Sequence, residues 1–321
     1  MVKQKILNGT VLRGIKNMTI KDLPDIECVI PGSAACPGCP ATIGLRVVFK
    51  ALGKNTIMVV PACCTAVIES LYPNTSFDIP VMNIAFEGAA AGASGVEAAL
   101  RKQGKTDTTV VAWAGDGGTY DIGIQALSGA LERQTNFIYI CYNNQIYSNT
   151  GIQRSGATPY AAWTTTTVKG KTEFRKEMGD IIMAHHIPYS AQACISYPED
   201  LYNKVKKAKS IKGSKYIEIL APCPPGWRFS MDKTVEMGKL AVETGAWALY
   251  ECENDVVTFN GKSKLILEKK IEPKPIEEWI KQQGRFRHLF KPERDEKRIK
   301  EIQEHTNQVW ERYRKCYLGK Q

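Results

Sequence analysis

Residues 108–117 read TTVVAWAGDG, an apolar run that passes directly into a Gly-Asp-Gly turn. The run has the length and the β-branched content of a buried strand. The two glycines allow the backbone to turn sharply and to approach a ligand closely. In open α/β sheets, ligands bind at the carboxyl ends of the strands, which is where this turn lies. The stretch therefore predicts a fold class and the position of a site together.

Strands and helices alternate outward from this stretch. We expect strands at residues 56–60, 81–86, 108–114, 136–142, 191–195 and 216–220, and helices at residues 41–52, 87–103, 122–133, 180–185 and 201–209. Such alternation predicts an α/β fold with a doubly wound, mostly parallel sheet.

The pattern changes after Leu249. Pro273 and Pro275 indicate a linker, and residues 293–317 have the composition of a long charged helix. We expect one large domain over residues 1–255, with an irregular leader at 1–30. A basic, partly helical C-terminal extension is expected over residues 256–321.

The composition indicates a soluble protein. Of its 321 residues, 43% are hydrophobic, enough for a large α/β core. No sustained apolar run follows Met1, and the densest apolar stretch, residues 57–68, is broken by Pro61 and Thr65. That stretch is too short to span a bilayer. We therefore expect a cytoplasmic protein that does not contact membranes.

The net charge of +10 is unevenly distributed. Residues 261–321 hold 17 Lys and Arg against 10 Asp and Glu, a net charge of +7. A solvated helical surface explains this excess, and so does contact with an acidic, ferredoxin-like partner. The basic residues are mixed with Glu and no nucleic-acid motif occurs, so we expect no binding to nucleic acid.

The Gly-Asp-Gly turn and a later pair of asparagines form a candidate Mg²⁺ and diphosphate site. Asp116 offers a carboxylate, Asn144 follows the next strand with an amide oxygen, and the turn beyond it offers the carbonyl of Ile146. Mg²⁺ prefers oxygen ligands and is often shared between protein and phosphate. Backbone amides at the start of a helix favour phosphate. The spacing therefore predicts a metal-bridged diphosphate.

Four of the ten cysteines form a second candidate site. Cys36 and Cys39 form a C-x2-C pair, Cys64 follows after 24 intervening residues, and Cys223 lies in a Pro-rich loop just past a strand. In a reducing compartment such thiols indicate metal ligation. An iron–sulfur cluster, a zinc ion and unligated thiols are all open, although the second C-x2-C of a zinc ribbon is absent. Neighbouring side chains point in different directions, so only one of Cys63 and Cys64 is expected to ligate.

With both motifs in place, the chain resembles the β subunits of 2-oxoacid:ferredoxin oxidoreductases, and most of all the pyruvate-oxidising members. The resemblance extends over nearly the whole chain. It is carried by CPGC at 36–39, AFE at 85–87, AGDGG at 114–118, LSGALER at 127–133, YSNTGIQRSGATP at 147–159, CPPGWR at 223–228 and AVETG at 241–245.

The resemblance implies thiamine diphosphate, Mg²⁺ and a neighbouring [4Fe–4S] cluster, with residues 1–255 as the cofactor-binding domain. The implied cluster ligands are Cys36, Cys39, Cys64 and Cys223, and the implied Mg²⁺ ligands are Asp116, Asn144 and the carbonyl of Ile146. Contacts to the organic cofactor would come from Phe86, Gly115, Gly117, Gly118, Thr119, Tyr147 and Asn149. Asn149 and Thr150 would face the reacting carbon as catalytic residues.

The implied activity is oxidative decarboxylation of a 2-oxoacid, with pyruvate as the first candidate, electron transfer to the cluster and acyl transfer to coenzyme A. The implied partners are an α subunit that supplies the glutamate activating the aminopyrimidine, γ and ferredoxin-like δ subunits or their equivalents, and ferredoxin. Departures from the family pattern at Pro37, Pro40, Cys63 and Gly88 leave a branched 2-oxoacid, an aryl glyoxylate and oxalate open as substrates. A thiamine-dependent decarboxylase with structural zinc is the alternative enzyme, and a non-catalytic scaffold or electron-transfer subunit is the alternative of another class.

Overall fold

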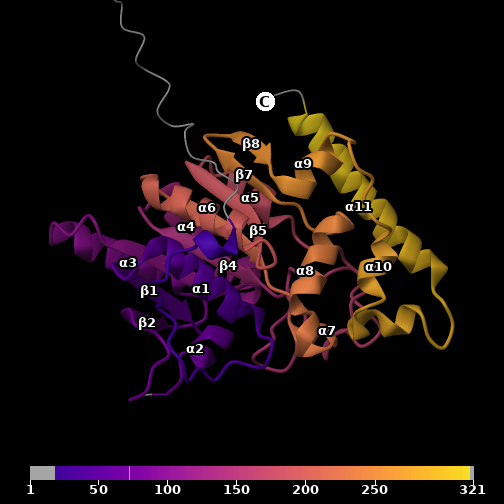
Figure 1. The fold of residues 1–321 in the computed structure, drawn as a ribbon, viewed down its shortest axis with the longest axis horizontal. Coiled ribbons are helices and arrows are strands. Elements are labelled where there is room, and N and C mark those ends of the chain that lie inside the picture. The colour runs from indigo at the N-terminus through magenta and orange to yellow at the C-terminus, as the bar shows by residue number, and fades with distance from the viewer. Residues whose placement is uncertain (1–18, 72, 319–321) are drawn as a thin grey trace, which may run out of the picture.

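The computed structural model describes residues 19–71 and 73–318 (Figure 1). The first part of the expected leader, residues 1–18, lies outside the described residues. From Thr19 to Cys39 the chain is mostly irregular, with one short 3₁₀ turn at Ile20–Asp22. This segment leads into the first long helix, α1, which Pro40 begins at the position where a missing amide proton costs nothing.

An eight-stranded sheet forms the centre of the molecule, in the order β2-β1-β3-β4-β6-β5-β7-β8. All pairings from β2 across to β5 are parallel, and β7 and β8 add an antiparallel hairpin at the edge next to β5. The strands are β1 (Thr56–Pro61), β2 (Val81–Ile84), β3 (Thr109–Gly115), β4 (Ile138–Asn143), β5 (Tyr189–Cys194), β6 (Lys215–Leu220), β7 (Tyr250–Glu253) and β8 (Val256–Phe259). The predicted doubly wound, mostly parallel sheet is confirmed.

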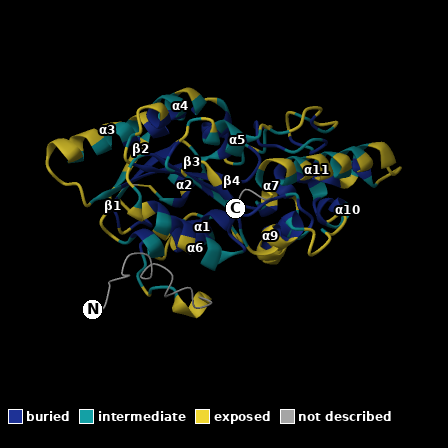
Figure 2. Cartoon of the chain, turned by 90° about the horizontal axis from the view of Figure 1, so that it is seen from above, coloured by how far each residue is buried: buried dark blue, intermediate teal, exposed yellow. Residues whose placement is uncertain are grey.

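Helices cover both faces of the sheet, as Figure 2 shows for α3, α4 and α5 on one side and α1 and α6 on the other. Strand β3 illustrates the cause. Val111 and Trp113 belong to the core beneath α1 and α6, whereas Val110, Ala112 and Ala114 belong to the core beneath α3 and α4. Successive strand side chains point to opposite faces, so a strand buried on both sides is apolar throughout.

The helices begin and end close to where the apolar periodicity predicts. The longer ones before residue 250 are α1 (Pro40–Leu52), α3 (Ala89–Lys102), α4 (Ile124–Glu132), α6 (Pro198–Ser210) and α8 (Thr234–Glu243), and the short ones are α2 (Cys64–Ile68), α5 (Met178–Met183) and α7 (Pro224–Trp227). Helix α4 begins two residues later than expected, because Gly117–Asp121 form a π-helical turn directly after β3. Such turns occur often at functional sites.

The C-terminal part packs against the domain through a cluster of aromatic side chains. It comprises β8, α9 (Gly261–Leu267), α10 (Ile276–Ile280), the 3₁₀ turn η4 (Gly284–Leu289) and α11 (Glu296–Tyr317), the last coloured yellow in Figure 1. Trp310 and Tyr313 of α11 pack on Phe259, and the indole of Trp310 donates to the carbonyl of Gly245 at 2.9 Å. The expected division after residue 255 falls in the turn between β7 and β8, so the extension contributes one strand to the sheet.

The topology brings the candidate residues to the edge of the sheet that is formed by the carboxyl ends of its parallel strands. The strands from β2 to β6 are parallel, so the segments that follow β1, β3, β4 and β6 all emerge at the same edge. These segments carry Cys64, Asp116, Asn144 and Cys223. Helix α1 runs back along the sheet toward the start of β1, so its N-terminal Cys39 lies at that edge as well.

Candidate active site and cysteine cavity

Three oxygen atoms converge where β3 and β4 end. The side-chain oxygen of Asn144 lies 2.7 Å from the carbonyl oxygen of Ile146 and 3.0 Å from Oδ1 of Asp116. All three residues are buried. Oxygens this close repel one another unless the Asn144 amide is turned over to donate a proton or a cation lies among them. These are the three groups predicted to hold Mg²⁺.

The burial of Asp116 fits a cation at this position. Loss of solvation raises the pKa of its carboxyl to about 7, and the hydrogen bonds from Ser155 and Asn144 oppose the shift. A buried carboxylate is costly without a positive partner. Mg²⁺ takes oxygen ligands and would supply that partner, so the residues present fit the metal.

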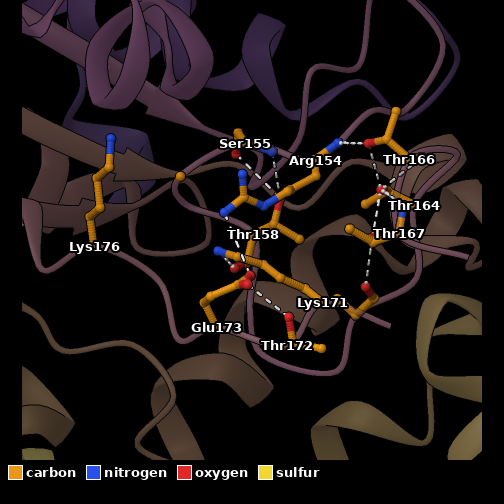
Figure 3. A network of polar contacts seen from close by, with 12 residues as sticks. Arg154, Ser155, Thr158, Thr164, Thr166, Thr167, Lys171, Thr172, Glu173 and Lys176 are labelled. Atoms are coloured by element: carbon orange, nitrogen blue, oxygen red, sulfur yellow. Dashed lines mark hydrogen bonds and ion pairs between the residues drawn. The ribbon is translucent and has the colours of Figure 1, made fainter. Parts of the chain in front are cut away.

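A polar network behind the turn fixes the orientation of Asp116, and Figure 3 shows its members Ser155, Thr158 and Lys171. Ser155 Oγ donates to Asp116 Oδ2 at 2.5 Å, and the Ser155 amide donates to Thr158 Oγ1 at 2.9 Å. The Thr158 hydroxyl in turn donates to the carbonyl of Gln145 at 2.7 Å. The backbone carbonyl of Thr158 accepts a hydrogen bond from Lys171 Nζ. The 147–159 segment therefore supports both strand ends from behind.

A cavity of about 300 Å³ opens in front of the three oxygens. It contains nearly all the residues predicted to contact thiamine diphosphate, and Asp116 is the only carboxylate among the described residues that line it. The predicted members are Phe86, Gly115, Asp116, Gly117, Gly118, Asn144, Ile146, Tyr147, Asn149 and Thr150. Thr119 is the exception, because its hydroxyl donates to the carbonyl of Gly115 at 2.8 Å and meets Tyr139 inside the core.

Tyr147 forms a rigid wall of this cavity. Its hydroxyl donates to Asp121 Oδ2 at 2.7 Å, and its ring meets Phe86 edge to face at 6.0 Å between centroids. A Cβ on Gly117 would lie only 1.7 Å from the Tyr147 ring, so the turn needs glycine at that position. The second glycine of the motif is therefore required by contact with a side chain on the following loop.

The four predicted cysteines line a second cavity, of about 190 Å³. Cys36 is exposed, and the other three are partly buried. Burial raises the pKa of Cys64 to about 11 and that of Cys223 to about 12, so these groups are thiols unless a metal stabilises the thiolate. Cys63 does not line this cavity and is packed toward Tyr142 instead.

The described residues show no preassembled site for a single metal ion. Sulfurs around one Zn²⁺ would lie about 3.8 Å apart, given a Zn–S distance of about 2.3 Å. Within residues 19–71 and 73–318, no three His, Cys, Asp or Glu side chains converge closely enough to hold a metal ion. Four cysteines that line one cavity are the kind of ligand set that a [4Fe–4S] cluster takes.

The two cavities adjoin each other. Cys64, Tyr142, Asn144, Ser148 and Asn149 line both. Groups bound in the two cavities would therefore be neighbours, with only this shared wall between them.

Several residues that support the site were not predicted from the sequence. Trp227 donates its indole N–H to the carbonyl of Asn144 at 2.7 Å, and Ser148 bridges Asn144 and Cys64. Arg285 reaches the loop from the C-terminal extension, donating to Gln145 Oε1 at 2.7 Å. Ser148 and Trp227 lie in segments that carry the family resemblance, whereas no local sequence pattern marks Arg285.

Comparison with known proteins agrees with this geometry. Residues 62–219 match the family described as thiamine pyrophosphate enzyme, C-terminal TPP binding domain. The chain is 50% identical to pyruvate synthase subunit PorB of Methanothermobacter marburgensis, over 91% of this chain and 99% of that one. It is 47% identical to ketoisovalerate oxidoreductase subunit VorB of Pyrococcus furiosus, over 91% of this chain and 94% of that one.

The chain belongs to the 2-oxoacid:ferredoxin oxidoreductase β subunits. Membership confirms the family predicted from the motifs and makes the chain a subunit of a hetero-oligomeric oxidoreductase. As a β subunit of the thiamine type, it contains the binding domain for thiamine diphosphate.

A solved structure shares the fold of this β subunit. It is a 2-oxoglutarate:ferredoxin oxidoreductase from Magnetococcus marinus, with a TM-score of 0.54 and 21% identity, over 71% of this chain and 82% of that one. None of the helices within the described residues is both long and apolar enough to cross a membrane.

Proposed function

We propose that this β subunit binds thiamine diphosphate, Mg²⁺ and a [4Fe–4S] cluster and takes part in the oxidative decarboxylation of pyruvate, with coenzyme A as the acyl acceptor. The observation that carries the proposal is the pair of adjoining cavities. One is built from the Gly-Asp-Gly turn and the 144–150 loop, and the other is lined by four cysteines.

When bound, thiamine diphosphate supplies the carbanion chemistry of decarboxylation, and the cluster accepts the electrons. Asp116, Asn144 and the carbonyl of Ile146 would hold Mg²⁺. The backbone of Gly115, Gly117 and Gly118 allows phosphate oxygens to approach closely, and the positive end of the π-helical turn favours their charge.

The remaining wall residues orient and shield the reacting group. Phe86 and Tyr147 provide apolar faces, and their mutual contact fixes the width of the cavity. Asn149 and Thr150 lie at the cavity mouth on the segment that follows Tyr147, and Asn149 also lines the cysteine cavity. Asn149 and Thr150 are our candidates for hydrogen bonding to the 2-oxoacid.

The choice of pyruvate rests on the relatives. The PorB relative is named for pyruvate synthase and the VorB relative for ketoisovalerate, and their identities to this chain differ by only 3%. We therefore keep ketoisovalerate, a branched 2-oxoacid, as the second candidate, with aryl glyoxylates and oxalate behind it.

The proposed assembly needs other chains. Asp116 is committed to Mg²⁺, and no second carboxylate among the described residues lines its cavity. The glutamate that activates the aminopyrimidine would come from the α subunit, with γ and ferredoxin-like δ subunits or equivalents completing the path to ferredoxin.

The basic extension is a weaker candidate for the ferredoxin contact than its charge suggests. Several of its basic residues pair with carboxylates of this chain: Lys262 and Lys274 with Glu243, Arg294 with Glu277 and Glu296, and Arg312 with Asp180. Glu243 and Asp180 belong to the domain, so part of the excess charge holds the extension in place.

The test is anaerobic purification of the assembled complex, with metal and thiamine analysis of this subunit and dye reduction assayed against a panel of 2-oxoacids, with and without coenzyme A. About four irons on this chain, bound thiamine diphosphate and pyruvate-dependent reduction stimulated by coenzyme A are expected. Stoichiometric zinc without iron would favour a decarboxylase with structural zinc, and absence of bound thiamine would favour a scaffold or electron-transfer subunit.

A further inference from the structure

Arg285 is a fully buried cation that has no carboxylate partner within residues 19–71 and 73–318. It lies in the η4 turn of the C-terminal extension and has no exposed surface. Its hydrogen-bond acceptors are two neutral amide oxygens, Gln283 Oε1 and Gln145 Oε1, each at 2.7 Å. Its Nη1 has no partner among the residues that the structure describes. Burying a cation in this way is costly and calls for a reason beyond packing.

The first contact leads to the loop that carries the proposed Mg²⁺ ligands. Gln145 stands between Asn144 and Ile146 and has a positive φ of 65°, a conformation that is strained for a residue with a side chain. Its backbone N–H donates to Asn143 Oδ1 at 2.9 Å, and its backbone carbonyl accepts from the Thr158 hydroxyl. The Arg285 guanidinium fixes the Gln145 side chain and so completes the set of contacts that hold this loop.

The second contact leads to the loop of Cys223. The Arg285 guanidinium stacks on the ring of Trp227 at 4.0 Å, and Trp227 donates its indole N–H to the carbonyl of Asn144 at 2.7 Å. The backbone of Trp227 donates to the carbonyl of Cys223 at 2.8 Å. One guanidinium therefore supports the metal-ligand loop directly and the cysteine loop through a single indole ring.

Its charge acts on both proposed sites. Burial lowers the pKa of Arg285, and the negative charges that Cys223 and Asp116 carry when they are deprotonated oppose that shift. An arginine stays protonated in proteins, so the positive charge persists despite the desolvation. Asp116 belongs to the cofactor cavity and Cys223 to the cysteine cavity.

We propose that Arg285 is a positioning residue shared by the two sites, which braces the Asn144–Ile146 loop and the Cys223 loop and holds a positive charge close to both. The inference deepens the proposed function and rests on it. It gives the C-terminal extension a role in cofactor binding, although the extension lies outside the matched thiamine pyrophosphate domain of residues 62–219.

Two physical consequences follow. A hydrogen bond from a charged donor contributes enough free energy that its loss changes an equilibrium constant by about tenfold or more. Removal of the guanidinium therefore lowers the affinity for Mg²⁺ and thiamine diphosphate. Removal of a nearby positive charge also disfavours the reduced, more negative cluster, so its midpoint potential becomes more negative.

The experiment uses the assembled complex with four variants of this chain. Arg285→Met removes the charge and the bonds, and Arg285→Lys keeps the charge without the planar fork. Gln145→Asn shortens the side chain by one methylene, which withdraws the acceptor from Arg285, and asparagine tolerates a positive φ. Arg294→Met is the matched control, since it removes the same charge from the same extension at an exposed ion pair. Thiamine diphosphate affinity is measured by calorimetry after depletion, and the cluster potential by a redox titration followed by electron paramagnetic resonance.

Arg285→Met is expected to weaken thiamine diphosphate binding by about tenfold or more and to shift the potential negatively. Gln145→Asn should weaken binding and leave the potential unchanged, and Arg285→Lys should preserve the potential better than the affinity. Arg294→Met should match wild type in both.

Wild-type affinity and potential in Arg285→Met would overturn the inference, as would a lower melting temperature with both properties unchanged. If Arg285→Met does not assemble, wild-type affinity in both Arg285→Lys and Gln145→Asn overturns it. A wild-type complex that binds neither cofactor would instead overturn the proposed function.

Discussion

Cys64 Sγ lies 2.9 Å from Ser148 Oγ, and the same hydroxyl accepts a hydrogen bond from the Asn144 amide at 3.0 Å. With the Asn144 oxygen turned toward the proposed Mg²⁺, the amide nitrogen donates to the hydroxyl and leaves the hydroxyl proton free to point at the sulfur. One side chain thus joins a proposed cluster ligand to a proposed Mg²⁺ ligand. The cavities share a wall, and this contact crosses it.

Ser148→Ala should shift the cluster potential to more negative values and leave the iron content unchanged. Hydrogen bonds to ligand sulfurs stabilise the reduced cluster, so their loss favours the oxidised form. A shift of a few tens of millivolts is expected, where about 59 mV corresponds to a tenfold change for one electron. Ser94→Ala, which removes a hydroxyl bonded to its own helix, is the control. An unchanged potential in Ser148→Ala would show that the Ser148 hydroxyl does not donate a hydrogen bond to the Cys64 sulfur.

Asp116→Asn should abolish measurable binding of thiamine diphosphate with Mg²⁺ and spare the cluster. The substitution keeps the shape of the side chain and removes the charge that balances the metal, so a loss of at least about 100-fold is expected, beyond that of supporting residues. Bound thiamine and iron are measured on the same sample. Asp78→Asn, at an exposed ion pair with Lys54, is the matched control. Full cofactor occupancy in Asp116→Asn would show that the Mg²⁺ site lies elsewhere.

Cys64→Ala should lose or degrade the cluster, and Cys63→Ala should keep it. Only Cys64 lines the cavity shared with Cys36, Cys39 and Cys223, whereas Cys63 is directed toward Tyr142. Iron per chain and visible absorbance after anaerobic purification measure the difference. The reverse result would move the ligand set by one residue.

Gly117→Ala should weaken thiamine diphosphate binding by about tenfold or more, since the new Cβ would displace the Tyr147 ring that the Asp121 hydrogen bond holds in place. Gly95→Ala is the matched control, because nothing lies within 4 Å of a Cβ at that position of helix α3. The control should stabilise the helix by about 0.5–1 kcal/mol and leave binding unchanged. Equal affinities in the two variants would show that the Tyr147 wall does not shape the cofactor site.

The strand that ends in Gly-Asp-Gly was predictable because its chemistry is local. An apolar run, a turn glycine and a following helix lie within 25 residues, and parallel topology then brings the ends of β1, β4 and β6 to the same edge. Most of the candidate site follows because ligands bind where the carboxyl ends of parallel strands meet. Thr119 lies outside the cavity: the family resemblance implied a contact with the cofactor, and the Thr119 hydroxyl bonds back to Gly115 inside the core.

The rest of the site depends on contacts between segments distant in the sequence. Arg285 meets Gln145 across 140 positions, and Trp227 meets Asn144 across 83. No periodicity or capping signal specifies such a pair, because each side chain is compatible with many burial sites until the tertiary structure forms. The same reason explains why the boundary expected after residue 255 falls inside a hairpin: β8 pairs with β7 only once the sheet is in place.

The isolated chain should not oxidise 2-oxoacids, even with thiamine diphosphate, Mg²⁺ and a full cluster. Asp116 is the only carboxylate among the described residues that line the cofactor cavity, and in the proposed site it is a ligand of Mg²⁺. No other acid among the described residues of the cavity is then available to activate the aminopyrimidine. Beyond the four cysteines of the cavity, the chain also has no second cysteine-rich segment of ferredoxin type to carry electrons outward.

Two assays distinguish the requirement for an activating carboxylate from the requirement for an outward electron path. The purified single chain is tested against a panel of 2-oxoacids with an artificial electron acceptor, which removes the requirement for an outward path, and the same preparation is then mixed with the other subunits. Cofactor binding without turnover is expected in the first assay, because the activating carboxylate is missing, and recovery is expected in the second. Turnover by the single chain close to that of the complex would mean that a carboxylate of this chain reaches the aminopyrimidine, and that the β subunit is catalytically complete.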